Sequence, residues 1–589
     1  MNLHFRSFSR PFAWILFGCI LFGSMALGTA ATAQSPQPKA GDPLSFLNSD
    51  QLERFLLGKE QFLRTFSEAE GLGPGFNQDS CASCHALPIG GTSPITVTRF
   101  GSADKGAPFD PLDAEGGSLL QANAISTECL EIVPPTATII ADRITPSILG
   151  AGLIEAIDGA DIVALQSNGG VVHWVPLLES PAAPLAVGRF GWKSQLATLM
   201  SFSGDATLME MGITNSILAA ENAPNGDTTL LPVCDSVADP EEPMDNGVPY
   251  LQRITDFQMF LAPPPQTPRS GMSGETIFNN IGCAQCHHPE YTTGTSPEAG
   301  MSGVTFRPYS DFLLHDMGAL GDGIAQGDAL ETEMKTPPLW GLRIRGQLLH
   351  DGRVLVQDLY QGVNDAVNWH FGDALASQQA WNNLDKSEQD KVVAFLDSLG
   401  RAEYDTDGNN FLNDADLPGF IDCWTGDAPG TFNADSPCAL HDLDQDGDVD
   451  AFDLSGLEQA YEATLEDCDN NGTWDLVQIL TQNGDTDGNG ILDACEEPFF
   501  RRGDGNLDGA VDISDAVSLL TALFGGVGLP ECFDASDSND DGALDIGDAV
   551  FTLSFLFSSG TAMPAPGSET CGQDPTPDGL DCAAAVSCP

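Results

Sequence analysis

The sequence predicts a mainly α-helical protein: two helical domains with a β-rich or irregular insertion, followed by small helical modules. Three observations predict this fold class. The motif CxxCH occurs twice, at residues 81–85 and 283–287, amphipathic helical patterns lie near both copies, and acidic twelve-residue loops repeat beyond residue 400. A length of 589 residues allows about four domains.

The first 33 residues predict a secretory signal peptide. Arg6 and Arg10 precede an apolar run over residues 12–27, and the small residues 31–33 form an A-x-A cleavage site. The run also approaches the length of a membrane-spanning helix, so an uncleaved anchor is the alternative. With cleavage, we expect a chain without a membrane span that is periplasmic, secreted or held at the cell surface.

Each CxxCH motif predicts a covalently bound c-type haem, and therefore iron. Two thiols three positions apart can bond to the two vinyl groups of one haem, and the adjacent histidine can bind the iron. A redox CxxC pair and a zinc knuckle are the alternatives, but neither requires that histidine. The predicted cofactor-binding residues are Cys81, Cys84, His85, Cys283, Cys286 and His287.

Helical patterns around the motifs indicate two cytochrome c-like haem domains. Apolar residues between positions 52 and 66 share one helical face before the first motif, and a second amphipathic helix over 392–399 ends at Gly400. We expect the first haem domain at 34–265, with the β/irregular insertion at roughly 90–190, and the second at 266–400.

Ten cysteines remain after the haem motifs and Cys19 of the signal are set aside. In an exported protein this even number predicts up to five disulfides, whose pairing the sequence does not determine. Cys129 and Cys234 can join parts of the first domain. The other eight lie beyond residue 400: Cys423, Cys438, Cys468, Cys495, Cys532, Cys571, Cys582 and Cys588.

The charge balance excludes a nucleic-acid partner. The chain has 85 acidic and 23 basic residues, a net charge of −62, which repels nucleic acids and anionic lipid surfaces and favours cation binding. Residues 401–589 hold 40 of the acidic residues but only three arginines and no lysine. The chain therefore divides near residue 400.

Calcium-binding loops are predicted in this acidic third. Oxygen-bearing side chains recur at positions 1, 3, 5, 9 and 12 of loops that begin at residues 405, 442, 485, 504 and 537, and a partial copy begins at 467. The predicted metal ligands are Asp442, Asp444, Asp446, Asp453, Asp504, Asn506, Asp508, Asp515, Asp537, Asn539, Asp541 and Asp548. A disordered acidic tail is the alternative, but it would not need the positional pattern or the interleaved cysteines.

The last two loops are offset by 33 residues, and an apolar helix follows each of them. We therefore divide the acidic third into calcium-binding repeats at 401–500, a duplicated loop-and-helix module at 501–560 and a cysteine-containing tail at 561–589. The module has EF-hand-like loops and resembles type I dockerin modules, and 467–496 is similar to thrombospondin type 3 calcium repeats. The dockerin resemblance implies a cohesin-like or cell-surface partner.

Residues 45–400 resemble the exported di-haem oxidoreductases, also called thiol oxidoreductases, which are relatives of the bacterial di-haem cytochrome c peroxidases. The resemblance rests on six runs: GLGPGFN at 71–77, GRFGW at 188–192, MGITN at 211–215, HDMG at 315–318, TPPLWG at 336–341 and HDGR at 350–353. It implies a two-domain, mainly helical fold. One haem would receive electrons from a donor protein, such as a small cytochrome or a cupredoxin, and the other would meet the substrate, which is hydrogen peroxide in the peroxidase relatives.

Haem chemistry suggests roles for further residues. An electron-transfer haem prefers His/Met ligation, and Met317 is the preferred candidate, ahead of Met334 and Met301; packing in the core is the alternative. A peroxidatic haem needs an open position with an acid/base group beside it. In the peroxidase relatives this group is a Glu with a nearby Gln, and the resemblance assigns these catalytic roles to Glu210 and Gln195, although their spacing departs from that of the peroxidases.

Three more side chains have two interpretations each. Trp192 is an electron relay between the haems or a packed core residue. His315 and His350 bind haem propionates or an iron, or are hydrogen-bonded core histidines. His370 lies outside the family-like runs and has no predicted role.

The sequence therefore predicts an exported di-haem c-type cytochrome oxidoreductase, peroxidase-like, that passes electrons from an external donor through the His287 haem to the His85 haem. A relative of the enzyme that oxidises protein tryptophans is an enzymatic alternative. The non-enzymatic alternative is a di-haem electron-transfer protein tethered by a calcium-binding dockerin-like module, with both haems six-coordinate.

Overall fold

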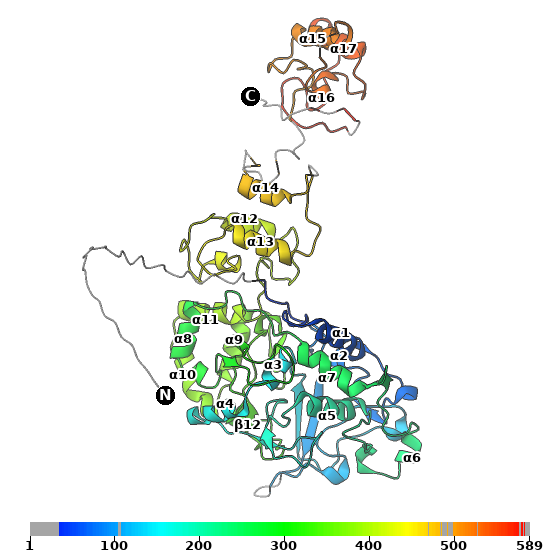
Figure 1. Cartoon of the computed structure of the whole chain (residues 1–589), viewed down its shortest axis with the longest axis vertical. Coiled ribbons are helices and arrows are strands. Elements are labelled where there is room, and N and C mark those ends of the chain that lie inside the picture. Colours follow the sequence, from blue (N-terminus) through cyan, green and yellow to red (C-terminus); the bar gives the residue numbers. More distant parts are fainter. Residues whose placement is uncertain are drawn as a thin grey trace, which may run out of the picture.

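The computed structural model describes residues 35–103, 108–468, 471–482, 484–485, 492, 499–526, 528–576, 579–580 and 582. The signal peptide predicted for residues 1–33 lies outside the described residues. Within them helices predominate and every sheet has two strands, which confirms the mainly α prediction. No described helix has the length and apolar character needed to cross a membrane. Figure 1 shows the helices before residue 400 in one body, beyond which the modules of the acidic third follow in chain order.

We use "first lobe" for residues 35–265 and "second lobe" for residues 266–400, after the two predicted haem domains. The longer helices of the first lobe are α1 (Ser49–Leu63), α5 (Leu199–Met211) and α7 (Tyr250–Phe260). Helix α1 packs along α7. The two backbones approach closely at Gly58, where a Cβ atom would lie 2.4 Å from the carbonyl oxygen of Arg253. The rings of Phe55 and Phe62 both pack on Phe257, with centroid distances of 5.3 and 4.7 Å. The helix predicted before the first CxxCH motif is thus a core element of this lobe.

The insertion is a β-ribbon followed by short helices. Strand β2 (Thr96–Gly101) pairs antiparallel with β4 (Ile139–Ile144), and α3 (Ala151–Glu155) and α4 (Gly159–Ala164) follow. The predicted β character therefore holds for the ribbon but not for residues 151–164. A disulfide joins Cys129 to Cys234 at the end of α6 (Leu231–Cys234).

The second lobe, residues 266–400, packs α8 (Ser273–Asn280) against α11 (Lys386–Ser398). Asp385 caps α11 in a capping box with Glu388, so the helix begins earlier than the stretch 392–399 predicted from its apolar residues. The ring of Phe278 lies 5.4 Å from that of Phe395 in this core. Two further helices, α9 (Leu359–Asn368) and α10 (Leu375–Asn382), complete the lobe.

The remaining strands form short antiparallel pairs. In the first lobe these are β1 (Gly75–Phe76) with β3 (Asn123–Ala124), β5 (Trp174–Val175) with β6 (Ala186–Val187), and β7 (Met244–Asp245) with β8 (Val248–Pro249). In the second they are β9 (Tyr291–Thr292) with β10 (Thr305–Phe306), β11 (Leu314–Asp316) with β12 (Glu333–Lys335), and β13 (Gln347–Leu348) with β14 (Val354–Leu355).

The described part of the acidic third is folded around small cores of its own. Its helices are α12 (Leu417–Cys423), α13 (Ala451–Ala460), α14 (Asp475–Gln482), α15 (Ile513–Phe524), α16 (Phe533–Ser536) and α17 (Ile546–Ser558). Tyr404, Val449 and Leu457 are buried together near α12 and α13. A disulfide joins Cys423 to Cys438. These features argue against a disordered acidic tail.

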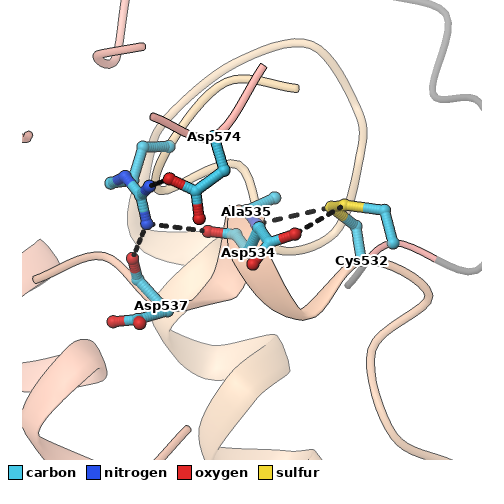
Figure 2. The surroundings of a disulfide bond; sticks show 7 residues. Cys532, Asp534, Ala535, Asp537 and Asp574 are labelled. Carbon is cyan, nitrogen blue, oxygen red and sulfur yellow. Dashed lines mark hydrogen bonds and ion pairs between the residues drawn. A yellow bond between two sulfur atoms is a disulfide. The ribbon is translucent and has the colours of Figure 1, made fainter. Parts of the chain in front are cut away.

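The cysteine-containing tail packs back onto the duplicated module instead of standing apart from it. A disulfide joins Cys532 to Cys582, and Figure 2 shows this bond beside Asp534, at the start of α16. Nearby, the buried guanidinium of Arg502 donates to the carbonyl oxygen of Asp537 at 2.8 Å and to the carboxylate of Asp574 at 2.7 Å. Residues beyond 560 therefore stabilise the module at 501–560.

Candidate haem and metal sites

The first CxxCH motif forms a short helix with a fixed histidine. Helix α2 (Cys81–Cys84) is capped by Ser80, whose side chain accepts a hydrogen bond from the Ser83 backbone. His85 donates from Nδ1 to the carbonyl oxygen of Gly91 at 3.1 Å, which leaves Nε2 with a lone pair for a metal. Burial lowers the pKa of His85 to about 4, so the imidazole is neutral near pH 7, as a ligand must be.

The second motif repeats this arrangement. His287 Nδ1 donates to the carbonyl oxygen of Tyr309 at 3.0 Å. Burial, together with the neighbouring His370 and His315, lowers the pKa of His287 to about 3. The four cysteines of the two motifs form no disulfides. Both motifs therefore offer two thiols and a neutral, oriented imidazole.

A cavity opens beside each motif. The first is lined by Cys81, Cys84 and His85, and the second, the larger of the two, by Cys283, Cys286 and His287. The two cavities share a wall made of residues 144–146 and Trp192.

One buried cation, Lys335, and one half-buried cation, Arg345, test whether a haem fits the second cavity. Lys335 and Arg345 line it, and neither has a carboxylate ion-pair partner among the described residues. Burial, with Arg345 nearby, lowers the pKa of Lys335 to about 7. Buried cations without a counter-ion are costly unless an anion joins them. The two propionates of a haem are anions of the required kind, so this donor set fits the cofactor.

Glu210 and Gln195, the predicted catalytic pair, both line the cavity of His85. Glu210 is on α5, and its Oε2 accepts a hydrogen bond from Asn77 Nδ2 at 2.7 Å. Burial raises the pKa of Glu210, against the effect of the Asn77 hydrogen bond and the positive charge of Arg99. The carboxyl group is thus oriented, and it holds a proton more tightly than an exposed Glu does.

A glycine makes room for the second member of the pair. Gly191 has φ +78°, and a Cβ atom there would lie 2.1 Å from Gln195 Nε2. Gln195 Oε1 accepts a hydrogen bond from the Lys193 backbone at 3.2 Å, which leaves its Nε2 free to donate. The sequence run 188–192 therefore positions the amide of Gln195 at the cavity wall.

Sequence reasoning missed two charged residues of the first cavity. Asp205 lies one turn before Glu210 on α5, and burial raises the pKa of its carboxyl group. Arg99, on β2, lines the same cavity, and its buried Nε has no hydrogen-bond partner among the described residues. No motif marks either residue, because the insertion and α5 meet only in the folded chain.

The second cavity holds three candidate sixth ligands. Met317 and Met334 both line it, whereas Met301 is buried in a core cluster that also includes residues of α1 and α7. His370 also lines this cavity, although no role is predicted for it from the sequence. Its Nδ1 donates to the carbonyl oxygen of Ala366 at 2.8 Å, in the same manner as the two motif histidines. The repeated Nδ1–carbonyl bond is the structural feature that singles out His370.

The other three side chains with open roles lie near the cavities. Trp192 donates from Nε1 to the carbonyl oxygen of Ile144 at 2.8 Å, and its ring centroid is 6.3 Å from that of His350, which lines the second cavity. His315 is held by Asp311 at 2.8 Å and lies 3.7 Å from the Cys286 sulfur. The ring of His315 is therefore already hydrogen-bonded to Asp311. Trp192 is part of the wall between the two cavities.

Two predicted calcium loops bring their carboxylates together. One oxygen each from Asp442, Asp444 and Asp453 lies within 4.8 Å of the others, and the same is true of Asp405, Asp407 and Asp416. Burial and the neighbouring carboxylates raise the pKa of Asp442 to about 6 and of Asp453 to about 7. Asp446 accepts a hydrogen bond from the Asp448 backbone.

The two duplicated loops close in a similar way. Asp504 accepts the backbone N–H groups of Asp508 and Gly509, and Asp515 accepts those of Asn506 and Asp512. In the second copy the corresponding residues are Asp537, Asn539, Asp541 and Asp548. Of the predicted ligands in the loop that begins at 485, only Asp485 lies inside the described residues, and Asp469 of the partial copy lies outside them.

Comparison with known families gives one match. Residues 133–399 match a family model described as "Di-haem oxidoreductase, putative peroxidase". The match includes the second CxxCH motif and both predicted catalytic residues, but it begins after the first motif. No curated protein is significantly similar to the chain.

Three solved structures align over about two thirds of the chain at 15% identity and a TM-score of 0.27. They are a MauG-like protein associated with microbial copper homeostasis, covering 64% of this chain and 95% of that one; Kuenenia stuttgartiensis hydrazine synthase, covering 67% and 100%; and the diheme peroxidase BthA from Burkholderia thailandensis, covering 63% and 92%. TM-scores this low support no inference about this chain. Residues 133–399 nevertheless carry the sequence pattern of the di-haem oxidoreductase family, in agreement with the resemblance of the motifs.

Proposed function

We propose that the chain is an exported di-haem c-type oxidoreductase of peroxidase-like activity, in which an external donor protein reduces the His287 haem and electrons pass on to the His85 haem. One observation carries the proposal: the acid/base candidates Glu210 and Gln195 line the cavity of His85, whereas the candidate iron ligands line the cavity of His287. The first cavity therefore has the acid/base groups that substrate chemistry needs. The second has side chains that can close the iron to substrate, as electron transfer requires.

A haem held by Cys81, Cys84 and His85 supplies an iron at which peroxide can be reduced. The protein's own part is to manage the protons. Asn77 fixes Oε2 of Glu210, so Oε1 is the oxygen that exchanges a proton with the substrate. Gln195 Nε2 donates a hydrogen bond that orients the substrate in the same cavity.

For the His287 haem, we favour His370 over Met317 as the sixth ligand. The hydrogen bond from Nδ1 to Ala366 orients the imidazole and leaves Nε2 unprotonated, and His370 lies close enough to lower the pKa of His287. Met317 lines the cavity, but within the described part of the chain no hydrogen bond orients its side chain. Either ligand closes the iron to substrate, as electron transfer requires.

Trp192 is the proposed relay between the two haems. It is the aromatic residue of the wall that the cavities share, and its Nε1 is bound to the Ile144 carbonyl oxygen. A fixed aromatic ring in this wall gives the electron a short route through the protein.

The test is spectroscopic. EPR and electronic spectra of the half-reduced, calcium-loaded protein are recorded before and after hydrogen peroxide is added. We expect one high-spin haem that reacts with peroxide and one low-spin haem that does not. Two low-spin haems, both inert to peroxide, would overturn the peroxidase proposal and favour a non-enzymatic electron-transfer protein.

We further propose that the acidic third binds calcium and tethers the oxidoreductase to a cohesin-like or cell-surface partner. Its duplicated helices expose the same apolar side chains at a 33-residue offset: Ile513 and Ile546, Val517 and Val550, Phe524 and Phe557. Helices α15 and α17 pack on each other through other residues, so this repeated surface is not used within the module. Calcium-dependent binding of the chain to cell surfaces, lost in Val517→Asp/Val550→Asp but kept in the exposed control Glu531→Gln, tests the tether.

A further inference from the structure

Three carboxylates meet in the module of α12 and α13, and of these only Asp450, at position 9, belongs to the predicted loop that begins at residue 442. Asp427 comes from the segment closed by the Cys423–Cys438 disulfide, and Asp448 and Asp450 come from the end of the loop before α13. One oxygen from each lies within 4.8 Å of the others. This group shares no residue with the neighbouring cluster of Asp442, Asp444 and Asp453.

The buried member of the group has an unused oxygen. Asp448 is 1% exposed, and its Oδ2 accepts a hydrogen bond from the Ala428 backbone. Its Oδ1 is also buried, and no described residue forms a hydrogen bond with it. A buried carboxylate oxygen without a donor is strongly unfavourable unless a cation or proton compensates it. The orphaned oxygen therefore indicates a missing partner.

No side chain supplies that partner. No lysine, arginine or histidine among the described residues forms an ion pair with Asp427, Asp448 or Asp450. The Asp450 carboxylate caps α13: it accepts the Phe452 backbone N–H at 2.7 Å and takes part in a capping box with Asp453. Three like charges at this separation repel one another, and a hard divalent cation relieves both the repulsion and the orphaned oxygen.

We propose that Asp427, Asp448 and Asp450 bind a second calcium ion, separate from the one predicted for the cluster of Asp442. In the twelve-residue loop pattern, residue 448 occupies position 7, which contributes its backbone carbonyl, so its side chain is available for another site. Carboxylate oxygens are the ligands that calcium prefers, and water and nearby carbonyl groups complete its coordination.

The proposed ion joins two segments that already touch. The Thr425 backbone donates to the Val449 carbonyl oxygen at 3.0 Å, and Phe432 donates to that of Gly447 at the same distance. Calcium bound by Asp427 and Asp448 adds a cross-link to this backbone contact. The site thus holds the disulfide-closed segment against the loop.

The experiment counts calcium bound to the full chain by equilibrium dialysis and elemental analysis. We expect Asp427→Asn and Asp448→Asn each to bind one calcium fewer than the unmodified chain. Asp422→Asn, an exposed residue of α12 with the same change of charge, should lose none. Asp442→Asn should also lose one, and the double variant Asp427→Asn/Asp442→Asn should lose two.

Equal calcium counts in Asp427→Asn and Asp422→Asn would overturn the proposal, and so would a double variant that loses only one ion. Because Asp427 is exposed, Asp427→Asn should fold, and its calcium count tests the site even if Asp448→Asn does not fold. A loss in Asp427→Asn without a loss in Asp442→Asn would support this site while contradicting the predicted loop. The outcomes for the two sites are therefore distinguishable.

Discussion

Replacement of Glu210 by glutamine tests the proposed acid/base chemistry most directly. Glutamine has the same shape, and its amide oxygen can still accept the 2.7 Å hydrogen bond from Asn77, so the side chain should keep its place. The variant loses only the group that exchanges a proton. General acid–base catalysis contributes about 10²–10⁴-fold in rate, or roughly 3–5 kcal/mol in the barrier. We expect a loss in this range in steady-state peroxide reduction.

A second variant perturbs the same group without removing it. Asn77→Ala deletes a hydrogen bond to the charged form of Glu210, an interaction of about 2 kcal/mol. Removal of a donor that favours the carboxylate raises the pKa, so the acid limb of the pH–rate profile should move to higher pH. The haem absorption spectrum should not change in either variant.

The control is Glu60→Gln, the same substitution at an exposed position of α1. It should leave turnover and spectra unchanged. If Glu210→Gln, with an unaltered haem spectrum, kept a third or more of the wild-type rate, Glu210 would not be the proton-exchanging group.

Three further predictions concern other parts of the chain. His370→Ala should convert the low-spin EPR signal of the His287 haem to high spin, whereas Met317→Leu should not; the reverse result would identify Met317 as the ligand. Loss of the Cys129–Cys234 disulfide, which spans 105 residues, should destabilise the first lobe by up to about 4.7 kcal/mol in denaturant titrations, and an unchanged midpoint would contradict this. Without calcium, the stability of the acidic third should fall as pH rises from about 4 to 7. Burial raises the pKa of Asp453 to about 7, so folding favours the protonated form of this carboxyl group. Calcium should reduce this pH dependence of stability, which circular dichroism measures.

Local chemistry made much of the candidate site predictable. The CxxCH motif holds both thiols and the histidine within five residues, so no knowledge of the fold is needed to assign them. The helix before the first motif was predicted because its buried face, including Phe55 and Phe62, repeats with the helical period. The loop at residue 442 was predicted because its ligand positions are fixed along the chain.

What remained hidden depends on contacts between distant segments. His370 follows α9, with no nearby cysteine or family-like run, and only the folded second lobe brings it to the cavity of His287. Asp427 reaches Asp448 because the Cys423–Cys438 disulfide folds its segment back. Helices α3 and α4 are too short to show a period.

The wall shared by the two cavities has a consequence for how the protein can be altered. Residues 144–146 and Trp192 face both cavities, so a change of polarity there alters the surroundings of both proposed haems at once. Reduction potentials depend on burial and on nearby hydrogen bonds. Substitution in this wall should therefore shift the two potentials together, and the chain can tune them separately only through residues that face a single cavity, such as Glu210 and Lys335.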